Sequence, residues 1–484
     1  MLQIFLTVVR EISLIVNLST MKYFYFNLLT IFPDIEYDLY RNLLDWYEII
    51  IVIILFFFIN AWVDKKNKIE YKENLKLFIN LKLAGALFIT LLYNLYYVGG
   101  DTSGYFNDGR LLNKVLLVDP VKGIEMFFSS GNSKNWSDDL TTSFDGFRFA
   151  NDPSTWLVCK IAAIFELITF RSMLGTGMLF GFISARFMWR FYETMLHIYP
   201  YARKQLAFAV LFIPNVLLWG SGIFKDTITL SLTMMVFVCM YNLFKLKKKF
   251  LTNLFILIIS VYIVFVIKSY IIVTFIGSIM IWIFSLVKIK SNIVRIVLKP
   301  FLLFLFGVIF YFAFDQFTAT FEKFSIDSIL ETTKKTGEYL KGVSEKSEGS
   351  VYDIGTLTPT VPGLLKLAPA AINVTLFRPY LWESGKIIIF FSAIESTAIF
   401  LFSLFVLFKV GFLKIIYQIF KDPLLLSFFI FTVVLAIFVG LSSFNFGTLV
   451  RYKIPCIPLY LIVLGVILKK NQVKILIPPS VKSK

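Results

Sequence analysis

The sequence predicts an all-α integral membrane protein with about eleven transmembrane helices, interfacial helices and two long extracytoplasmic loops. Of its 484 residues, 58% are hydrophobic and 16% are charged, whereas soluble chains average roughly 45–50% apolar residues and about a quarter charged. The apolar residues gather in runs near the roughly 20 residues that a spanning helix needs. Lysines and arginines cluster between these runs, as in cytoplasmic loops. We expect one polytopic membrane domain over residues 1–484.

The apolar runs define the expected spans in chain order. These are residues 46–63, 77–99, 172–196, 205–222, 227–244, 251–267, 270–287, 298–314, 386–408, 424–441 and 454–468. A tight turn near Lys268 separates the sixth run from the seventh. No internal repeat of fixed period is evident, and no segment has the composition of a sizeable soluble domain.

Residues 156–170 are apolar but short, and they contain Lys160 and Glu166. If they crossed the membrane, the basic run from Lys245 to Lys249 would lie outside, against the preference of Lys and Arg for the cytoplasmic side. We therefore expect 156–170 to form an interfacial or re-entrant helix.

With that choice the basic loops fall on the cytoplasmic side. The long polar stretches 101–155 and 315–383, and the short turn 222–226, fall outside. Residues 1–20 carry charges within an apolar stretch, and an interfacial helix and a further span both remain open for them. We expect a multi-pass protein of the inner (plasma) membrane.

Charge and metal-binding residues exclude several functions. The net charge of +17 comes mainly from clusters between apolar runs rather than from a basic face on a soluble domain, so nucleic acid is not an expected partner. Cys159, Cys239 and Cys456 form no CxxC pair. His197 is the single histidine and is expected at a helix end near the lipid headgroups. No metal site and no cofactor are expected.

The first outer polar group begins where the span 77–99 leaves the membrane. Its sequence is GGDTSGYFNDGR, and its glycines let the backbone come close to a ligand. Asp101 and Asp108 are candidate catalytic carboxylates, with Tyr105 and Arg110 as candidate substrate-binding residues. Helix capping is an alternative role for Asp108.

Three further outer residues are candidates for holding an anionic substrate. Lys225 and Asp226 lie between two apolar helices with almost no loop, where a charged pair is costly unless it is paired or bound. A snorkelling lysine followed by a helix-capping aspartate is the alternative. Lys268 adds another outer cation.

Two more groups come from the second half of the chain. Arg378, Trp382 and Glu383 precede the span 386–408, and such residues at a membrane surface suit a sugar or a phosphate headgroup. An interfacial aromatic belt with a structural Arg–Glu pair is the alternative. Arg451 and Tyr452 open the last span on the outer side, where basic flanks are unusual.

Several of these motifs carry a family resemblance. Gly100-Asp101 with Tyr105, an interfacial segment at 156–170 and Arg451-Tyr452-Lys453-Ile454-Pro455 resemble the GT-C superfamily of polytopic glycosyltransferases. The first loop is also similar to the Gly-x-Asp-x-x-x-Tyr loop of O-antigen and exopolysaccharide polymerases. The resemblance implies a metal-independent transfer from a polyprenyl-phosphate-linked sugar donor to a glycan acceptor in cell-surface glycan synthesis. Asp101 would then be the general base, and Arg451 and Lys225 would bind the lipid phosphate.

Two other functions stay open at this point. A transporter or flippase for lipid-linked glycans would carry charges deep in the bilayer, and Arg186 and Arg190 within 172–196 favour it. A non-enzymatic membrane subunit of an envelope assembly would need no sensitive acidic residue. The sequence leaves open the sugar, the linkage, the acceptor and the choice between polymerase and single-sugar transferase. Membrane lipids are expected partners in every case.

Overall fold

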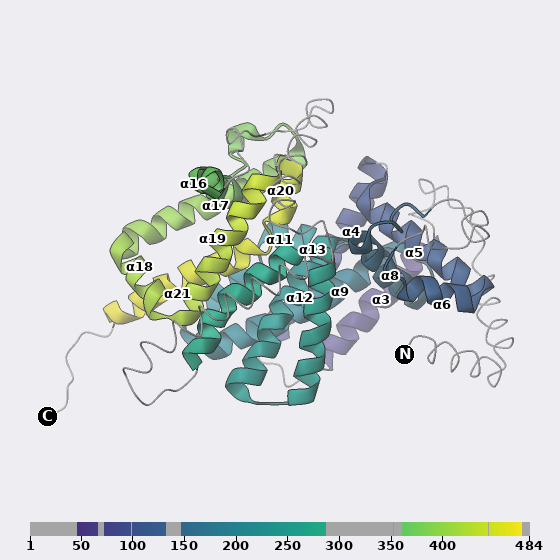
Figure 1. The fold of residues 1–484 in the computed structure, drawn as a ribbon, viewed down its shortest axis with the longest axis horizontal. Coiled ribbons are helices and arrows are strands. Elements are labelled where there is room, and N and C mark those ends of the chain that lie inside the picture. The colour runs from purple at the N-terminus through teal and green to yellow at the C-terminus, as the bar shows by residue number, and fades with distance from the viewer. Residues whose placement is uncertain are drawn as a thin grey trace. The chain divides into compact units, whose positions relative to one another are not determined.

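The computed structural model describes residues 46–65, 72–97, 99–131, 147–286, 352, 361–443 and 445–476. Over these residues the chain is built of helices, and no strand occurs (Figure 1). Six of the described helices are long and apolar enough to cross a membrane, and a bent pair raises the number to seven. The chain is therefore a multi-pass α-helical membrane protein.

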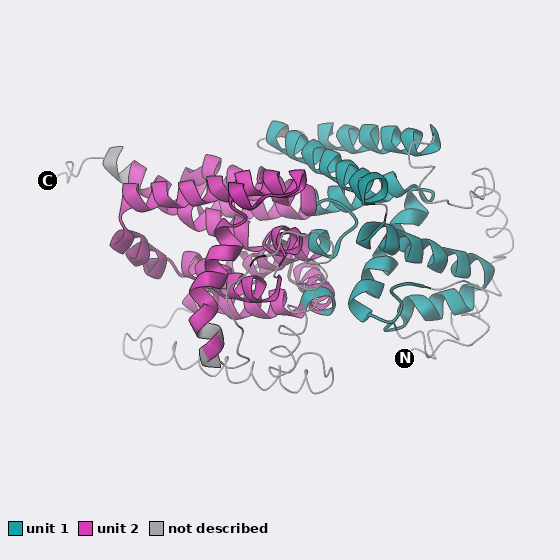
Figure 2. Cartoon of the chain, turned by 90° about the horizontal axis from the view of Figure 1, so that it is seen from above, with its two compact units in different colours: residues 1–186, 220–228, 266–268 teal, residues 187–219, 229–265, 269–484 magenta. Residues whose placement is uncertain are grey.

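The chain divides into two compact units (Figure 2). Unit 1 comprises residues 1–186, 220–228 and 266–268, and unit 2 comprises 187–219, 229–265 and 269–484.

Unit 1 contains the first helices and the start of the long helix α9. Its elements are α3 (Trp46–Asp64), α4 (Lys72–Leu91), the π-helix η1 (Leu92–Tyr96), α5 (Asp101–Val118), α6 (Pro120–Phe128), α8 (Pro153–Ile168) and the first half of α9 (Met173–Ile198). Helix α5 packs on both α6 and α8. Glu48 on α3 accepts hydrogen bonds from the amides of Met173 (2.9 Å) and Leu174 (3.2 Å). A carboxylate in that place suits the positive N-terminal end of α9.

Unit 2 holds the rest of α9 and most of the C-terminal helices. They are η3 (Pro200–Ala202), α10 (Arg203–Leu211), α11 (Pro214–Trp219), α12 (Lys225–Met240), η4 (Tyr241–Leu246), α13 (Phe250–Leu286), α16 (Val361–Phe377), η6 (Leu381–Glu383), α17 (Ile387–Val410), α18 (Phe412–Lys421), α19 (Pro423–Ser443), α20 (Phe446–Tyr452) and α21 (Cys456–Leu476). The first residues of α12 and residues 266–268 of α13 belong to unit 1. Helix α19 approaches α16 so closely that a Cβ at Gly440 would lie 2.4 Å from the carbonyl oxygen of Ala371.

Most expected spans that fall on described residues match candidate membrane helices. The matches are 46–63 with α3, 77–99 with α4 and η1, 227–244 with α12 and η4, 386–408 with α17, and 424–441 with α19. The span 454–468 lies in the bent pair α20 and α21, whose axes differ by 59°. The expected helices at 1–20 and 298–314 lie outside the described residues, and the count of eleven spans is not confirmed.

Two expected spans differ from the structure. Residues 205–222 do not form one helix: α10 ends at Leu211 and α11 begins at Pro214, because a proline has no N–H to continue the helical hydrogen bonds. Residues 172–196 form the continuous helix α9, but α9 is not among the six candidates, since Arg186, Arg190 and Glu193 lower its hydropathy.

Helix α8, at the place of the expected interfacial segment, has 16 residues and is also not among the candidate spans. Asp152 caps its N-terminus by accepting from the Ser154 amide, and Pro153 occupies the first helical position. The segment is helical, and its expected interfacial or re-entrant placement stays a prediction.

The first polar stretch, 101–155, is not a simple loop. Residues Asp101–Val118 form α5 because Tyr105, Leu112 and Val115 recur at helical spacing and are buried. Part of the second polar stretch, 315–383, is also helical, as α16, while residues 315–351 and 353–360 lie outside the described residues.

Helix α13 has 37 residues, and its backbone leaves helical geometry at Lys268 (φ −149°, ψ 78°). The break falls where the sequence predicts a turn between 251–267 and 270–287. At this break the Lys268 side chain pairs with Asp226, which also belongs to unit 1.

Candidate functional site

Asp101 lies at the first position of α5, directly after a two-glycine turn. Gly99 and Gly100 have φ angles of 127° and 112°, which residues with a side chain rarely adopt. A Cβ at Gly100 would also lie 3.1 Å from the ring of Tyr93. The turn therefore requires glycine, and it places Asp101, half-buried, at the positive end of a helix.

Lys225 is the centre of a charged cluster in unit 1. Its ammonium lies 3.5 Å from Asp152 Oδ2 and donates to Ser154 Oγ at 2.7 Å. Lys225 also interacts electrostatically with Asp101 and with Lys268. Residues far apart in the chain thus meet around one lysine.

The Asp152 carboxylate is stabilised in its ionised form. Burial raises the pKa of Asp152, but the Lys225 ammonium and hydrogen bonds from two neighbouring hydroxyls outweigh it. The pKa therefore lies below its ordinary value of 3.8. Asp152 remains an anion at neutral pH and keeps Lys225 in place.

Lys268 and Asp226 form the most deeply buried ion pair of the cluster. The ammonium donates to Asp226 Oδ1, and the side chains are only 8% and 2% exposed. Asp226 stands in the first turn of α12, where a carboxylate suits the helix dipole. The pair fixes the break in α13 against the start of α12 within unit 1.

Asp108 is placed differently from Asp101. It is buried, and its two oxygens accept the backbone amides of Arg148 (3.1 Å) and Phe149 (2.7 Å). Burial raises the pKa of the Asp108 carboxyl, and these amides lower it by less. Tyr105 packs its ring 5.1 Å from that of Phe149. Asp108 and Tyr105 thus tie the 147–150 segment to α5.

Arg110 faces the interior of unit 1. It interacts electrostatically with Glu166 on α8, while Asn113 donates to the same carboxylate at 3.3 Å. Burial raises the pKa of Glu166 well above its ordinary range despite the nearby guanidinium. Both residues belong to the packing of α5 against α8.

In unit 2, Arg378 and Glu383 pair within one short segment. Arg378 Nε donates to Glu383 Oε2 at 3.0 Å, and a second nitrogen donates to the other carboxylate oxygen. The guanidinium also lies over the rings of Tyr352 and Phe446, at 5.4 and 5.3 Å. This fork-to-fork geometry makes Arg378 a firmly positioned cation.

Trp382, which lies between them in the chain, has an exposed side chain (81%). Its ring stacks on Tyr380 with the centroids 4.9 Å apart. An exposed aromatic face beside a fixed Arg–Glu pair can lie against an apolar sugar face or the headgroup region of a membrane.

The last outer group joins the same part of unit 2. Lys453 is buried and donates to the carbonyl oxygen of Arg378 (2.9 Å) and to Ser396 (2.7 Å). Arg451 lies 6.0 Å from the ring of Trp219, within range of a cation–π interaction. Tyr452, the candidate between them, is half-buried at the end of α20.

A buried carboxylate completes this group. Glu395 on α17 accepts the amide of Asn215 (2.7 Å) and its side-chain nitrogen (3.0 Å), and it interacts electrostatically with Lys453. Ser392 donates to the Asn215 oxygen at 2.9 Å. This network links α11, α17 and the end of α20 through polar contacts.

The structure therefore groups most of the predicted residues, together with Asp152, Glu395 and Lys453, into two clusters. The unit 1 cluster contains Asp101, Asp152, Lys225, Asp226 and Lys268. The unit 2 cluster contains Arg378, Trp382, Glu383, Glu395, Arg451 and Lys453. Asp108, Tyr105 and Arg110 hold helices together beside the first cluster.

Three residues of these clusters, Asp152, Glu395 and Lys453, were not predicted from the sequence as site residues. Asp152 carries a signal in the Asp-Pro-Ser start of α8, a typical N-cap. Glu395 carries another, since a carboxylate within an apolar span is functional by default. Lys453 appears in the sequence only as one residue of the motif Arg451-Tyr452-Lys453-Ile454-Pro455, with no sign of its buried partners.

The described residues include no group of three or more His, Cys, Asp or Glu that could hold a metal ion. Comparison with known proteins finds no matching family model, no similar curated protein and no similar solved structure.

Proposed function

We propose that this protein is a glycosyltransferase or polysaccharide polymerase that uses polyprenyl-phosphate-linked sugars at the outer face of the plasma membrane. The observation that carries the proposal is the unit 1 cluster: Lys225 interacts with Asp101, Asp152 and Lys268, which come from three distant segments. Such a cluster offers both a base and cations, which glycosyl transfer from a lipid phosphate requires.

In this reaction an acceptor hydroxyl attacks the anomeric carbon, the bond from that carbon to the phosphate oxygen breaks, and the lipid phosphate leaves with the electron pair. Asp101 is the proposed general base for the hydroxyl proton, because it is half-buried at the mouth of a glycine turn. Lys225 is the proposed counter-ion for the departing phosphate. The buried Lys268–Asp226 pair would hold α12, and with it Lys225, in position.

The unit 2 cluster supports a role in holding the donor or acceptor. Arg378 is fixed by Glu383, and Trp382 offers its exposed face. Aromatic faces and Arg–carboxylate pairs are typical of surfaces that bind sugars and headgroups. Arg451 is the second proposed phosphate-binding cation.

One observation favours the transporter alternative. Lys82, within the apolar helix α4, is fully buried and donates to Ser184 (3.2 Å) and to the carbonyl of Gly220. Charged residues at membrane depth near broken helices are typical of transporters. Lys82 would then act on substrate passage, and Asp101 would be dispensable.

The test uses Asp101→Asn, with Asp119→Asn as the matched control. Asp119 is the N-cap of the neighbouring helix α6, and asparagine caps a helix as well as aspartate does. In cells lacking the native protein, we expect Asp101→Asn to abolish the surface glycan and to accumulate its lipid-linked donor, detected by mass spectrometry. Asp119→Asn should restore the glycan at equal protein level.

The outcomes separate the functions. Accumulated single repeat units indicate a polymerase, and a glycan lacking one sugar indicates a single-sugar transferase. Intermediates trapped on the inner leaflet indicate a transporter. A normal glycan profile in Asp101→Asn at normal protein level would refute the proposed base.

A further inference from the structure

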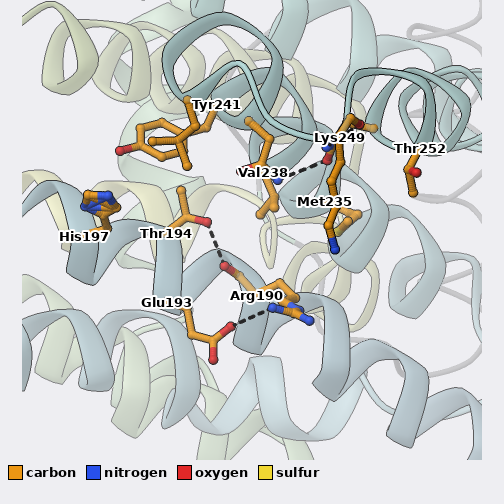
Figure 3. A pocket seen from close by; sticks show the side chains of 12 residues that line it. Arg190, Glu193, Thr194, His197, Met235, Val238, Tyr241, Lys249 and Thr252 are labelled. Carbon is orange, nitrogen blue, oxygen red and sulfur yellow. Dashed lines mark hydrogen bonds and ion pairs between the residues drawn. The ribbon is translucent and has the colours of Figure 1, made fainter. Parts of the chain in front are cut away.

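A cavity of about 320 Å³ lies within unit 2, at the C-terminal end of α9 (Figure 3). Its walls come from α9, from α12 with its π-helical extension η4, and from the start of α13. The connection between η4 and α13, residues 247–249, is the end of the basic run 245–249, which the sequence pattern assigns to the cytoplasmic side. None of the residues proposed for glycosyl transfer lines this cavity.

Two cationic side chains extend into the cavity from opposite walls. Arg190 comes from α9, and its Nη1 lies 3.4 Å from Glu193 Oε2. Lys249 comes from the basic run, and Figure 3 shows its chain reaching towards the part of the cavity that Arg190 occupies. With one carboxylate for two cations, this part of the cavity carries an excess positive charge.

The backbone that presents Lys249 is held in an unusual conformation. Lys249 has φ 47°, a left-handed angle that costs energy for a residue with a side chain. The side-chain nitrogen of Asn253 donates to the Lys249 carbonyl oxygen at 2.9 Å. The side-chain oxygen of Asn253 in turn accepts from the side-chain nitrogen of Asn242 at 3.0 Å. Both asparagines line the cavity, so the loop is fixed by the cavity's own wall.

The rest of the lining supplies hydrogen-bonding groups. The hydroxyl of Thr252 and the imidazole of His197 both line the cavity. The His197 ring lies 6.0 Å from that of Tyr241 in an edge-to-face arrangement. His197 stands in the last turn of α9, the helix-end position that the sequence predicts for it.

We propose that this cavity binds a phosphate group, either the headgroup of an anionic lipid or a soluble phosphate. Arginine presents a planar fork that matches phosphate oxygens, and lysine adds a compact point charge. Basic pockets between helices on the cytoplasmic side suit anionic headgroups. The volume is at the lower end of the range for small-ligand sites, enough for a phosphate and a short ester.

This site is separate from the proposed glycosyl-transfer site, and the two proposals do not depend on each other. It also gives a role to Arg190, a charge that the enzyme proposal does not use. The loop is not the only source of positive charge, because Arg190 lies on α9 and Lys249 lies on the connection between η4 and α13.

The experiment uses the full-length protein in nanodiscs. One arm contains phosphatidylcholine with a small fraction of phosphatidylglycerol, and the retained lipid is counted by native mass spectrometry. The other arm contains phosphatidylcholine alone and is titrated with inorganic phosphate, followed by the thermal unfolding midpoint. The arm that shows saturable binding identifies the source of the phosphate.

The variant is Arg190→Gln combined with Lys249→Gln, and the control is Lys248→Gln, a neighbouring lysine that does not line the cavity. Each charge-assisted contact contributes about a tenfold change in affinity, so the pair should weaken binding about 100-fold and the control less than about threefold. Lys249→Arg keeps the charge and should keep binding.

Three results would overturn the proposal. The first is that neither probe binds the wild-type protein. The second is that Lys248→Gln weakens binding as much as the double variant does, which would assign binding to the general charge of the loop. The third is that Lys249→Arg weakens binding as much as the single variant Lys249→Gln does. The comparison of the two single-residue Lys249 variants remains decisive if the double variant fails to fold.

Discussion

Asp226→Asn should be among the most destabilising single substitutions in unit 1. Asp226 is buried against Lys268, and the two side chains are 2% and 8% exposed. Removing one partner leaves the other charge in a poorly solvated place, which costs about 3–5 kcal/mol. The exposed pair Lys76–Asp64, at 3.0 Å in the same unit, gives the comparison. Lys76→Gln should cost at most about 1 kcal/mol, because solvent screens that pair.

The assay is reversible unfolding in mixed micelles, with the denaturing detergent raised stepwise and tryptophan fluorescence as the signal. A double-mutant cycle with Lys268→Gln isolates the pair from other effects. We expect the double variant to be more stable than Asp226→Asn alone, since no buried charge then lacks its counter-ion. If Asp226→Asn costs no more than Lys76→Gln, or if the two substitutions at the buried pair are additive, the reasoning about this pair is refuted.

Two further predictions concern the packing of α5. Gly104→Ala should destabilise the protein by about 1–3 kcal/mol in the same assay, because the added Cβ would lie 2.4 Å from the Phe149 ring. The control Gly277→Ala should not destabilise the protein, because no atom lies within 4 Å of the Cβ position there. Equal effects of the two substitutions would contradict this reasoning. Burial raises the folded-state pKa of Asp108, so the stability it contributes is highest below its ordinary pKa of 3.8 and falls as the pH rises through the raised value. Asp108→Asn should flatten that decline in a series of unfolding midpoints against pH, and an unchanged slope would count against it.

Much of the architecture could be predicted from hydropathy. A long apolar run has few alternatives to a helix in lipid, so the helices α3, α12, α17 and α19 fall within a few residues of the expected spans. The break near Lys268 was also predictable, because a lysine interrupts an otherwise apolar run there.

Other features depend on packing that a single sequence does not display. The polar stretch after residue 100 becomes α5 because it buries one face against α8. Its composition alone predicts a polar loop. Helix α9 carries Arg186, whose guanidinium lies 4.5 Å from the ring of Trp62. The sequence displays the arginines of this helix, but it does not display the contacts that hold them.

The sequence predicts some members of the candidate site, but not how they pair across the fold. Lysines and aspartates at span ends are visible in the sequence, but their partners depend on which helix ends meet. The link from Lys225 to Asp152 crosses 73 positions, from the start of α12 to the cap of α8. The link from Lys453 to Glu395 likewise needs the fold of unit 2, and so their functional grouping could not be read from spacing.

The interruption of α13 bears on how this long helix fits a bilayer. A straight helix of 37 residues would extend about 55 Å, nearly twice the thickness of the roughly 30 Å hydrocarbon layer. Each half on its own extends about 27 Å, close to one crossing. In the eleven-span topology that the sequence predicts, the break at Lys268 is the point where the chain reverses its direction across the bilayer.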